Sequence, residues 1–209
     1  MGNESGELRL VLPVGDGDHV LGPTSAAATL VEYGNYECIY CRQLHPHIKE
    51  VMKRAEGLRF VFRHFPIRRV HPHSARAAEA AEAATAQGRF WEMHDLLFKQ
   101  EGPLDDELLA RCAGKAGLDM RRYSEEMAAG VYADRVERDL TAATFEGHVS
   151  GTPTLYLNGV RRSDMRGLEG LLAAVEVAGA TLRADPNALT RLLGRLRQLR
   201  SHVTGRNPK

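Results

Sequence analysis

Residues 31–41 read VEYGNYECIYC, and this stretch decides the fold. An extended apolar run ends in a turn at Gly34, and two cysteines, Cys38 and Cys41, then open a helical pattern. A thiol in the first turn of a helix lies at the positive end of the helix dipole. In C-x-x-C motifs of this kind the thiol pKa falls from about 8.5 to roughly 3.5–7.5. The stretch therefore predicts a strand followed by a helix that carries a reactive dithiol.

The flanking sequence predicts a strand–helix–strand unit around the cysteines. Residues 28–33 form a short apolar run typical of a buried strand, and apolar positions in residues 41–55 follow helical spacing up to Gly57. Residues 58–65 then alternate as a further strand would. Such a unit places the cysteines at the carboxyl end of the first strand, where ligands bind in sheets of this type. Residues 8–14 also alternate, and we expect them to form an edge strand.

Sheet signals return only after a long helical region. Helical patterns occupy residues 70–147, and residues 154–157 are then a short apolar run before Asn158-Gly159, the strongest two-residue hairpin signal. We predict an α/β fold with a mixed central sheet. Residues 1–69 and 148–182 would build one domain, and residues 70–147 would be an all-helical insertion in it.

The last segment, residues 183–209, differs from the rest. Leucines recur on one side of a predicted helix, with arginines around them. This basic amphipathic stripe predicts packing on its own domain or on a second copy of the chain, which would make a homodimer. An acidic partner surface is the alternative interpretation.

The composition gives no indication of a nucleic-acid or membrane protein. The chain has 209 residues, 43% of them apolar, and a formal net charge of +1, so no global charge attracts a polyanion. No stretch approaches the roughly 18 apolar residues of a membrane span, and residues 1–7 lack the features of a signal peptide. We therefore expect a cytoplasmic protein. Cys112 lies far from the cysteine pair on an apolar helix face and is expected to be buried and inert.

A bare C-x-x-C spacing is also half of a zinc site. The sequence has no second C-x-x-C, so the remaining ligands would have to come from His45, His47, His71 or His73. The prolines between these histidines are explained more simply by helix and loop geometry. We predict no bound metal and no cofactor beyond the cysteines, and a zinc-binding C-x-x-C protein stays open as an alternative.

Further motifs accompany the cysteine pair. Glu32 stands six residues before the first cysteine, and the chain also carries FRHFP at 62–66, HPHSA at 71–75, GRFWEMH at 88–94 and GTPT at 151–154. Over roughly residues 26–180 this set resembles the DsbA-like branch of the thioredoxin-fold thiol-disulfide oxidoreductases. In that family a helical domain is inserted between the strand–helix–strand unit and a Thr-Pro sequence, which implies the same architecture here.

The resemblance implies a role for each matching residue. Cys38 would attack the substrate or receive the mixed disulfide, and Cys41 would resolve it. Pro153 would be cis and close to the sulfurs, and the Thr152 backbone would pair with an extended substrate segment as an added strand. Tyr40, between the cysteines, is expected to contact the substrate and to donate a hydrogen bond to the Cys38 sulfur.

Glu32 would be the family's buried acid near Cys41. A carboxylate in an apolar central strand costs free energy unless it is paired, so a role in proton transfer is reasonable. The alternative is a glutamate at the end of a strand that reaches solvent.

Two features depart from the family pattern. Ile39-Tyr40 separates the cysteines where the strongly oxidising periplasmic members carry proline and histidine, and Glu37 adds a negative charge beside the nucleophile. Both are expected to disfavour the thiolate relative to those members. The reduction potential would then be more reducing than about −120 mV, tending toward about −270 mV.

These observations predict an enzyme that exchanges disulfides with protein substrates or with a small thiol such as glutathione. In a reducing compartment it would reduce or reshuffle disulfides more than install them. The alternative from another class is a thioredoxin-fold binding module in which the cysteines are incidental.

Overall fold

The computed structural model describes residues 7–146 and 149–183. Apart from Arg183, the basic segment predicted to form a C-terminal helix lies outside the described residues, and so does its proposed role in a homodimer. Arg183 itself lies beside Arg54, because its backbone N–H donates to the Arg54 carbonyl at 2.7 Å.

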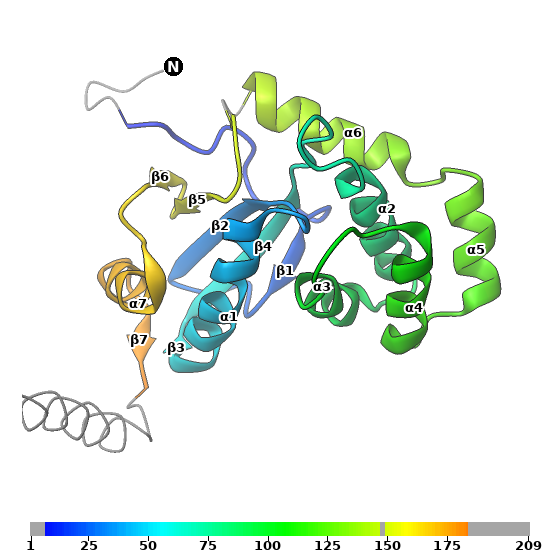
Figure 1. The fold of residues 1–209 in the computed structure, drawn as a ribbon. Coiled ribbons are helices and arrows are strands. Elements are labelled where there is room, and N and C mark those ends of the chain that lie inside the picture. The colour runs from blue at the N-terminus through cyan, green and yellow to red at the C-terminus, as the bar shows by residue number, and fades with distance from the viewer. Residues whose placement is uncertain (1–6, 147–148, 184–209) are drawn as a thin grey trace, which may run out of the picture.

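A five-stranded mixed sheet forms the centre of the molecule, in the order β1-β4-β2-β5-β6 (Figure 1). β2 and β4 run parallel, and the other neighbouring pairs run antiparallel. This confirms the predicted mixed central sheet. The strands are β1 (His19–Leu21), β2 (Ala28–Gly34), β4 (Leu58–His64), β5 (Thr154–Leu157) and β6 (Val160–Arg162).

Helix α1 (Ile39–Arg54) connects β2 to β4 and completes the predicted strand–helix–strand unit. In the described chain, five helices then follow between β4 and β5, and they gather on one side of the sheet region (Figure 1). They are α2 (Ser74–Thr85), α3 (Phe90–Phe98), α4 (Asp106–Ala116), α5 (Met120–Ala128) and α6 (Ala133–Thr141), which continues as the π-helical turn η1 (Ala142–Glu146). This order matches an inserted helical segment, and its domain boundaries stay predictions.

Helix α7 (Gly167–Val177) returns beside α1, and a small second sheet joins β3 (Ala55–Glu56) to β7 (Thr181–Leu182). Two aspartates cap helices of the inserted segment. The Asp105 side chain accepts the Leu108 N–H, and the Asp119 side chain accepts the N–H groups of the first turn of α5. These caps satisfy backbone donors that a helix start leaves unpaired.

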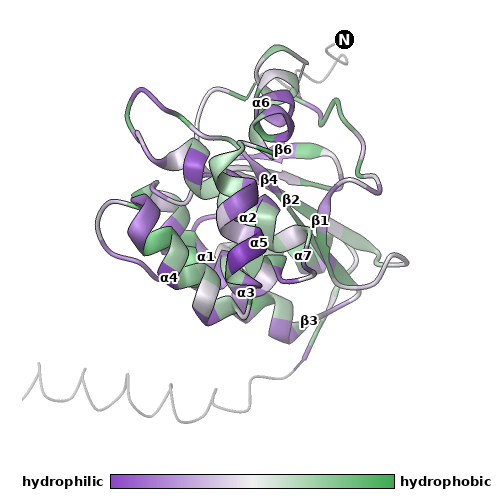
Figure 2. Ribbon diagram, turned by 90° about the vertical axis from the view of Figure 1, so that its right-hand side faces the viewer, coloured by the Kyte–Doolittle hydropathy of each residue, from purple (hydrophilic) through white to green (hydrophobic). Residues whose placement is uncertain are grey.

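The two faces of the sheet belong to two separate apolar clusters. Alternate residues of a strand point to opposite faces, so Leu30 and Phe62 pack in the larger cluster with α1, α3 and α7. Tyr33 and Val61 pack in a smaller cluster on the other face, together with Leu140 of α6. Hydrophobic residues colour much of the central strands, whereas hydrophilic residues mark the outward faces of the helices (Figure 2).

The prediction of an edge strand at residues 8–14 is wrong, because this segment does not form a continuous strand. This segment makes only an isolated bridge from Arg9 to Val160, next to β6. The opposite edge is formed by β1, which the sequence did not reveal because three residues are too short for a periodic pattern. Pro13, which has no N–H to donate, and the Gly15-Asp16-Gly17 turn instead lead the chain across to that edge.

Candidate active site

The turn between β2 and α1 presents the cysteine pair. The Asn35 side chain accepts the Glu37 N–H at 2.9 Å, and the Asn35 carbonyl accepts the Cys38 N–H at 3.0 Å. Cys38 is the N-cap of α1 and has extended backbone angles. Gly34 is required just before the turn, because a Cβ there would lie 2.4 Å from the Phe62 ring.

The two thiols have opposite environments, although both are reduced and buried. Hydrogen bonding from the Cys41 thiol is the largest influence on Cys38. Together with Thr152 and the N–H groups of Cys41 and Tyr40, it outweighs burial and lowers the pKa of Cys38 to about 5. Burial chiefly raises the pKa of Cys41, helped by its hydrogen bond to Cys38 and by the charge of Glu32. The site therefore holds one stabilised thiolate and one protonated thiol.

The loop before β5 contacts the Cys38 sulfur. The Thr152-Pro153 peptide bond is cis, as predicted. In the thiol form, Cys38 Sγ donates a hydrogen bond to the Thr152 carbonyl at 3.3 Å, although the two residues are 114 positions apart. The Thr152 hydroxyl is buried, and its interaction with the Cys38 sulfur contributes to the lowered pKa of Cys38. The fold thus brings together Cys38, Thr152 and Pro153 from segments distant in sequence.

Glu32 lies beneath the cysteines in β2 and is 2% exposed. Burial, with a further contribution from the charge of Cys38, raises the pKa of Glu32 to about 8, and a hydrogen bond with Cys41 opposes this rise. The carboxylate oxygen Oε1 makes no hydrogen bond within the described residues. The alternative of a glutamate that reaches solvent is therefore wrong.

The rim of the site is formed by exposed apolar side chains and a groove. Ile39 is 55% exposed and Tyr40 66%. The Tyr40 backbone N–H, a contact that the sequence did not suggest, helps to stabilise the Cys38 thiolate. Beside them is a groove of about 310 Å³, lined by Glu37, Arg42, Val70, His71, Pro72, His73, Gly102 and Pro103.

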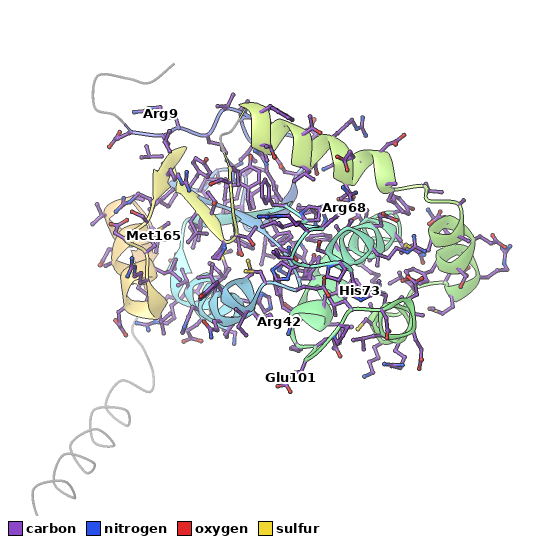
Figure 3. The ribbon with its side chains drawn as sticks, turned by 45° about the horizontal axis from the view of Figure 1, so that its top comes forward. Arg9, Arg42, Arg68, His73, Glu101 and Met165 are labelled. Atoms are coloured by element: carbon purple, nitrogen blue, oxygen red, sulfur yellow. The ribbon has the colours of Figure 1, made fainter. Side chains whose placement is uncertain are left out.

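Glu37 is held by the far wall of this groove. Its Oε2 accepts the His73 N–H at 2.9 Å, so the carboxylate anchors the loop that leads into α2. Arg42, on the first turns of α1, donates to the Tyr36 carbonyl at 3.1 Å and to the Gly102 carbonyl at 3.3 Å. Figure 3 shows Arg42 and His73 on neighbouring elements at this side of the molecule. The Glu37 and Arg42 side chains thus tie the motif turn to the inserted helical segment.

The other candidate residues lie away from the sulfurs. His45 pairs with Asp95 at 3.0 Å, and His94 contacts the Tyr36 hydroxyl at 3.1 Å inside the aromatic core. Within the described ranges, no histidine or carboxylate forms a three-ligand group with Cys38 and Cys41. Cys112 is 1% exposed, and burial raises its pKa, which confirms the expectation of a buried thiol.

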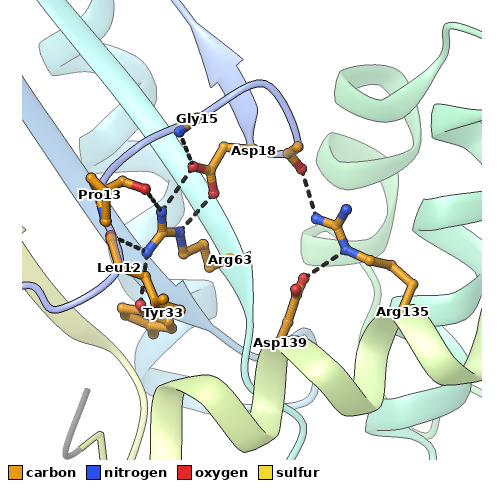
Figure 4. A pocket seen from close by; sticks show the side chains of 9 residues that line it. Leu12, Pro13, Gly15, Asp18, Tyr33, Arg63, Arg135 and Asp139 are labelled. Carbon is orange, nitrogen blue, oxygen red and sulfur yellow. Dashed lines mark hydrogen bonds and ion pairs between the residues drawn. The ribbon is translucent and has the colours of Figure 1, made fainter. Parts of the chain in front are cut away.

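The sequence did not reveal a second buried polar cluster on the opposite face of the sheet. We call it the Arg63 clamp, made of Arg63, Asp18 and Tyr33 (Figure 4). Arg63 donates to Asp18 at 2.6 and 2.8 Å, to the Tyr33 hydroxyl at 2.9 Å, and to the carbonyls of Leu12 and Pro13 at 2.9 and 3.1 Å. Arginine in a buried strand was the signal that could have revealed it, because such a charge requires a partner.

The fold and the site together define a thioredoxin-fold protein with a paired-cysteine site. The Thioredoxin family model matches residues 15–177, and the chain belongs to this family. A thioredoxin-like oxidoreductase from Silicibacter pomeroyi is 26% identical, with a TM-score of 0.69 over 78% of this chain and 93% of that chain. BdbD from Bacillus subtilis is 24% identical, with a TM-score of 0.69 over 78% and 92%.

Wolbachia pipientis α-DsbA1 shares the fold with a TM-score of 0.70 at 17% identity, over 80% of this chain and 93% of that chain. These neighbours confirm that the chain has the fold expected from the resemblance to the DsbA-like branch.

Curated relatives carry a different name. A protein named Na(+)/H(+) antiporter NhaA 3 from Salinispora tropica is 43% identical over 187 residues, which are 89% of this chain and 28% of that protein. One named Na(+)/H(+) antiporter NhaA from Herminiimonas arsenicoxydans is 38% identical over 164 residues, 77% and 26% of the two chains. The chain thus spans less than a third of the length of these relatives. In the described part of the chain, no helix is long and apolar enough to cross a membrane.

Proposed function

We propose that this chain exchanges disulfides with protein substrates through the Cys38–Cys41 pair. The observation that carries the proposal is the difference between the two thiols, because exchange needs a thiolate that attacks and a thiol that is held in reserve. The pKa of Cys38 is lowered to about 5, and the pKa of Cys41 is raised. Incidental cysteines in a binding module would not require this arrangement.

The reduction of a substrate follows from this geometry. The Cys38 thiolate attacks one sulfur of a substrate disulfide, a mixed disulfide forms, and the other substrate sulfur leaves as a thiolate. Cys41 then loses its proton and attacks Cys38 Sγ, which releases the second substrate sulfur. The substrate gains two electrons, and the enzyme ends with a Cys38–Cys41 disulfide. The same steps in reverse oxidise a substrate dithiol.

Glu32 supports the second half of this exchange. Its pKa of about 8 allows the carboxylate to accept a proton near neutral pH, and a hydrogen bond connects it to Cys41. We propose that Glu32 takes the Cys41 proton when Cys41 attacks. The buried position of the carboxylate beneath the sulfurs supports this role.

The backbone at Thr152 is the proposed contact for an extended substrate segment. Its carbonyl lies 3.3 Å from Cys38 Sγ, so a substrate strand paired there would carry its disulfide to the nucleophile. Exposed Tyr40 and the neighbouring groove would contact substrate side chains. Exchange with glutathione or another small thiol stays a prediction, and so do the cytoplasmic location and the homodimer.

The pKa of Cys38 changes the expected redox poise. A value of about 5 lies between about 7 for thioredoxin and about 3.5 for DsbA. A stabilised thiolate makes a dithiol a stronger oxidant. We therefore propose a potential between about −270 and −120 mV, less reducing than the sequence alone suggested.

The comparison with the proteins named as antiporters supports a proposal about those longer proteins. We infer that the portion matching this chain is a thioredoxin-family segment of those longer proteins. Ion transport is not carried over to this chain, because the match covers only 28% of the first of them.

Trapping the intermediate tests the proposed function. With a peptide disulfide as substrate, Cys41→Ser should accumulate a mixed disulfide at Cys38, detectable by mass spectrometry, since no second thiol resolves it. Cys38→Ser should form none and should lose exchange. Cys112→Ser is the matched control and should behave as the wild type. A Cys38→Ser chain that still exchanges disulfides would reject the proposal.

A further inference from the structure

A second cluster of chemically capable side chains lies outside the cysteine site. It consists of His19 on β1, His64 at the end of β4 and Glu82 on α2, and all three are buried. His19 is paired with Phe62 across the two strands, so His64 is its diagonal neighbour on the same face. The inserted segment brings Glu82 to this pair from the alanine-rich side of α2.

The three potential ligand atoms converge. His19 Nε2 lies 2.8 Å from Glu82 Oε1, and His64 Nε2 lies 3.3 Å from the same oxygen. All three atoms are within 4.8 Å of one another, and they are the only such group among the described histidine, cysteine and carboxylate side chains. The Phe90 ring stacks on His19 with centroids 3.6 Å apart and shields one side.

Hydrogen bonding alone does not account for the whole cluster. Glu82 accepts from His19, but His64 Nε2 makes no well-formed hydrogen bond to any described residue, although His64 is 1% exposed. His64 Nε2 shares Glu82 Oε1 with His19 at an ion-pair distance of 3.3 Å and makes no aligned hydrogen bond to a described residue, so this buried nitrogen is incompletely satisfied, which costs free energy. A cation held among the three atoms would satisfy it.

We propose that His19, His64 and Glu82 bind a zinc ion. Two imidazole nitrogens and one carboxylate oxygen bind Zn²⁺ together with a water in the fourth position, and a water would have to complete the tetrahedron here. Bonds of about 2.0–2.1 Å in a tetrahedron place ligand atoms about 3.3 Å apart. The His64–Glu82 separation of 3.3 Å already has this value, and His19 Nε2 at 2.8 Å from Glu82 would move outward by about half an ångström.

The ion would join three parts of the fold. It would hold the edge strand β1, the central strand β4 and the first helix of the inserted segment together. The cluster is buried and takes no part in the exchange steps, so the role is structural. This site is independent of the cysteine pair, whose own capacity to bind zinc has to be removed in any test.

The test uses the full chain with Cys38→Ser and Cys41→Ser, so that no thiolate pair competes. Zinc is added, excess is dialysed away, and bound metal is measured by mass spectrometry and by competition with a chromophoric chelator. We expect one zinc ion per chain. His64→Gln, which keeps the His19–Glu82 pair, should weaken binding more than about 100-fold, because even residues that only orient a metal ligand are worth 10–100-fold.

His45→Gln is the matched control. His45 is also a buried histidine beside a carboxylate, 3.0 Å from Asp95, but it belongs to no three-ligand group of the described residues. This variant should bind zinc like its parent. Unchanged binding in His64→Gln, or an equal loss in His45→Gln, would reject the site.

A measurement on the parent chain avoids any folding defect of a variant. Co²⁺ in a site of this kind gives visible absorption bands that Zn²⁺ should abolish on displacement, and zinc should raise the melting temperature. A parent chain that shows neither the bands nor the thermal shift would establish that the cluster is a hydrogen-bonded network only.

Discussion

Two buried polar clusters occupy opposite faces of the same two strands, and they differ in how completely their atoms are paired. Glu32 and Phe62 are opposite each other in the β2–β4 ladder, and so are Tyr33 and Arg63, one residue further along. The first pair faces the cysteines, and the second builds the Arg63 clamp. Neighbouring residues of the same strands therefore serve the cysteine site on one face of the sheet and the structural Arg63 clamp on the other.

In the clamp, charge and hydrogen bonds are matched. Burial alone would raise the pKa of Asp18, but hydrogen bonds from Arg63 and from the Gly15 N–H outweigh it and lower that pKa. In the cysteine site, Glu32 Oε1 is buried without a hydrogen bond among the described residues, and the pKa values of the two thiols are shifted in opposite directions. Complete pairing stabilises a fold, whereas incomplete pairing leaves groups free to react.

The largest effect is expected from breaking the clamp. Arg63→Met leaves the partly buried Asp18 carboxylate without its hydrogen-bonded cation, and the loss of one partner of a buried pair, about 3–5 kcal/mol, is the upper bound of the expected cost because Arg135 still acts on Asp18. Urea unfolding at pH 7 measures this loss. Arg59→Met on the same strand is the control, with an expected loss under about 1 kcal/mol, because Arg59 is only half-buried and its guanidinium bonds the Thr29 hydroxyl rather than a buried charge.

The pH dependence of this effect has a defined sign. The lowered pKa of Asp18 stabilises the wild-type fold above the ordinary aspartate range, and this contribution is lost as the pH falls. In Arg63→Met the unpaired carboxylate is relieved by protonation. The stability difference between the two chains should therefore narrow on acidification. A difference that widens would contradict the assignment of Asp18 as the partner.

A smaller effect is expected from Glu32→Gln in the cysteine site. General-base assistance contributes about 10²–10⁴-fold, so we expect the Cys41 attack on the mixed disulfide to slow by about 10²-fold at pH 8. In the wild type the rate should rise through pH 8, because the pKa of Glu32 is about 8 and only the carboxylate accepts a proton. Stopped-flow release of a fluorescent peptide thiol measures it.

The folding stability should increase in Glu32→Gln, whereas the exchange rate should decrease. A raised folded-state pKa stabilises the protein at low pH, and this contribution disappears as the pH rises from the ordinary glutamate value through about 8. The variant should therefore gain stability relative to the wild type over this interval. Glu92→Gln removes only a surface ion pair with Arg89, so it should leave the rate unchanged and alter the stability by less than about 1 kcal/mol. An identical pH–rate profile in Glu32→Gln and wild type would exclude the proton-transfer role.

The thiols themselves provide a third comparison. Alkylation of Cys38 should be half-maximal near pH 5, the value to which its pKa is lowered. At pH 6 we expect it to be about tenfold faster than a free thiol, because the larger thiolate fraction is partly offset by the lower nucleophilicity of an acidic thiol. Mass spectrometry of iodoacetamide adducts measures all three cysteines. Equal rates for Cys38, Cys41 and Cys112 would show that Cys38 is not the nucleophile.

The smallest effect concerns the redox poise. Equilibration with glutathione buffers should give the wild-type potential between about −270 and −120 mV. Tyr40→His places a cation beside the thiolate and should raise the potential by about 30 mV, equivalent to about 1.4 kcal/mol for a two-electron couple. Ile39→Val is the control with no change of charge. A lower potential in Tyr40→His would show that side-chain charge at this position does not set the stability of the thiolate.

The sequence was sufficient where local signals were strong. The C-x-x-C spacing, the Thr152-Pro153 dipeptide and the Asn158-Gly159 hairpin each act within a few residues, and all three appear where they were predicted. The Arg63 clamp and the His19–His64–Glu82 cluster were missed because their members are 45 and 63 positions apart along the chain. Their meeting depends on strand register and on the path of the inserted helices, which no local pattern encodes.

Asn35 shows an intermediate case. An asparagine two residues before Glu37 is a recognised turn signal, and its side chain does order the turn that presents Cys38. The sequence could have revealed this residue. The pKa values could not have been read in the same way, because they depend on the burial of both sulfurs and on the distant Thr152.

The alternation of β2 also limits how this strand can change in evolution. Glu32 serves the cysteines and its neighbour Tyr33 serves the clamp, so both faces of one short strand are committed. Inserting or deleting a single residue upstream would exchange the two faces, placing the phenol beneath the dithiol and the carboxylate against Arg63. Length changes in residues 28–34 should therefore be absent from functional descendants of this chain.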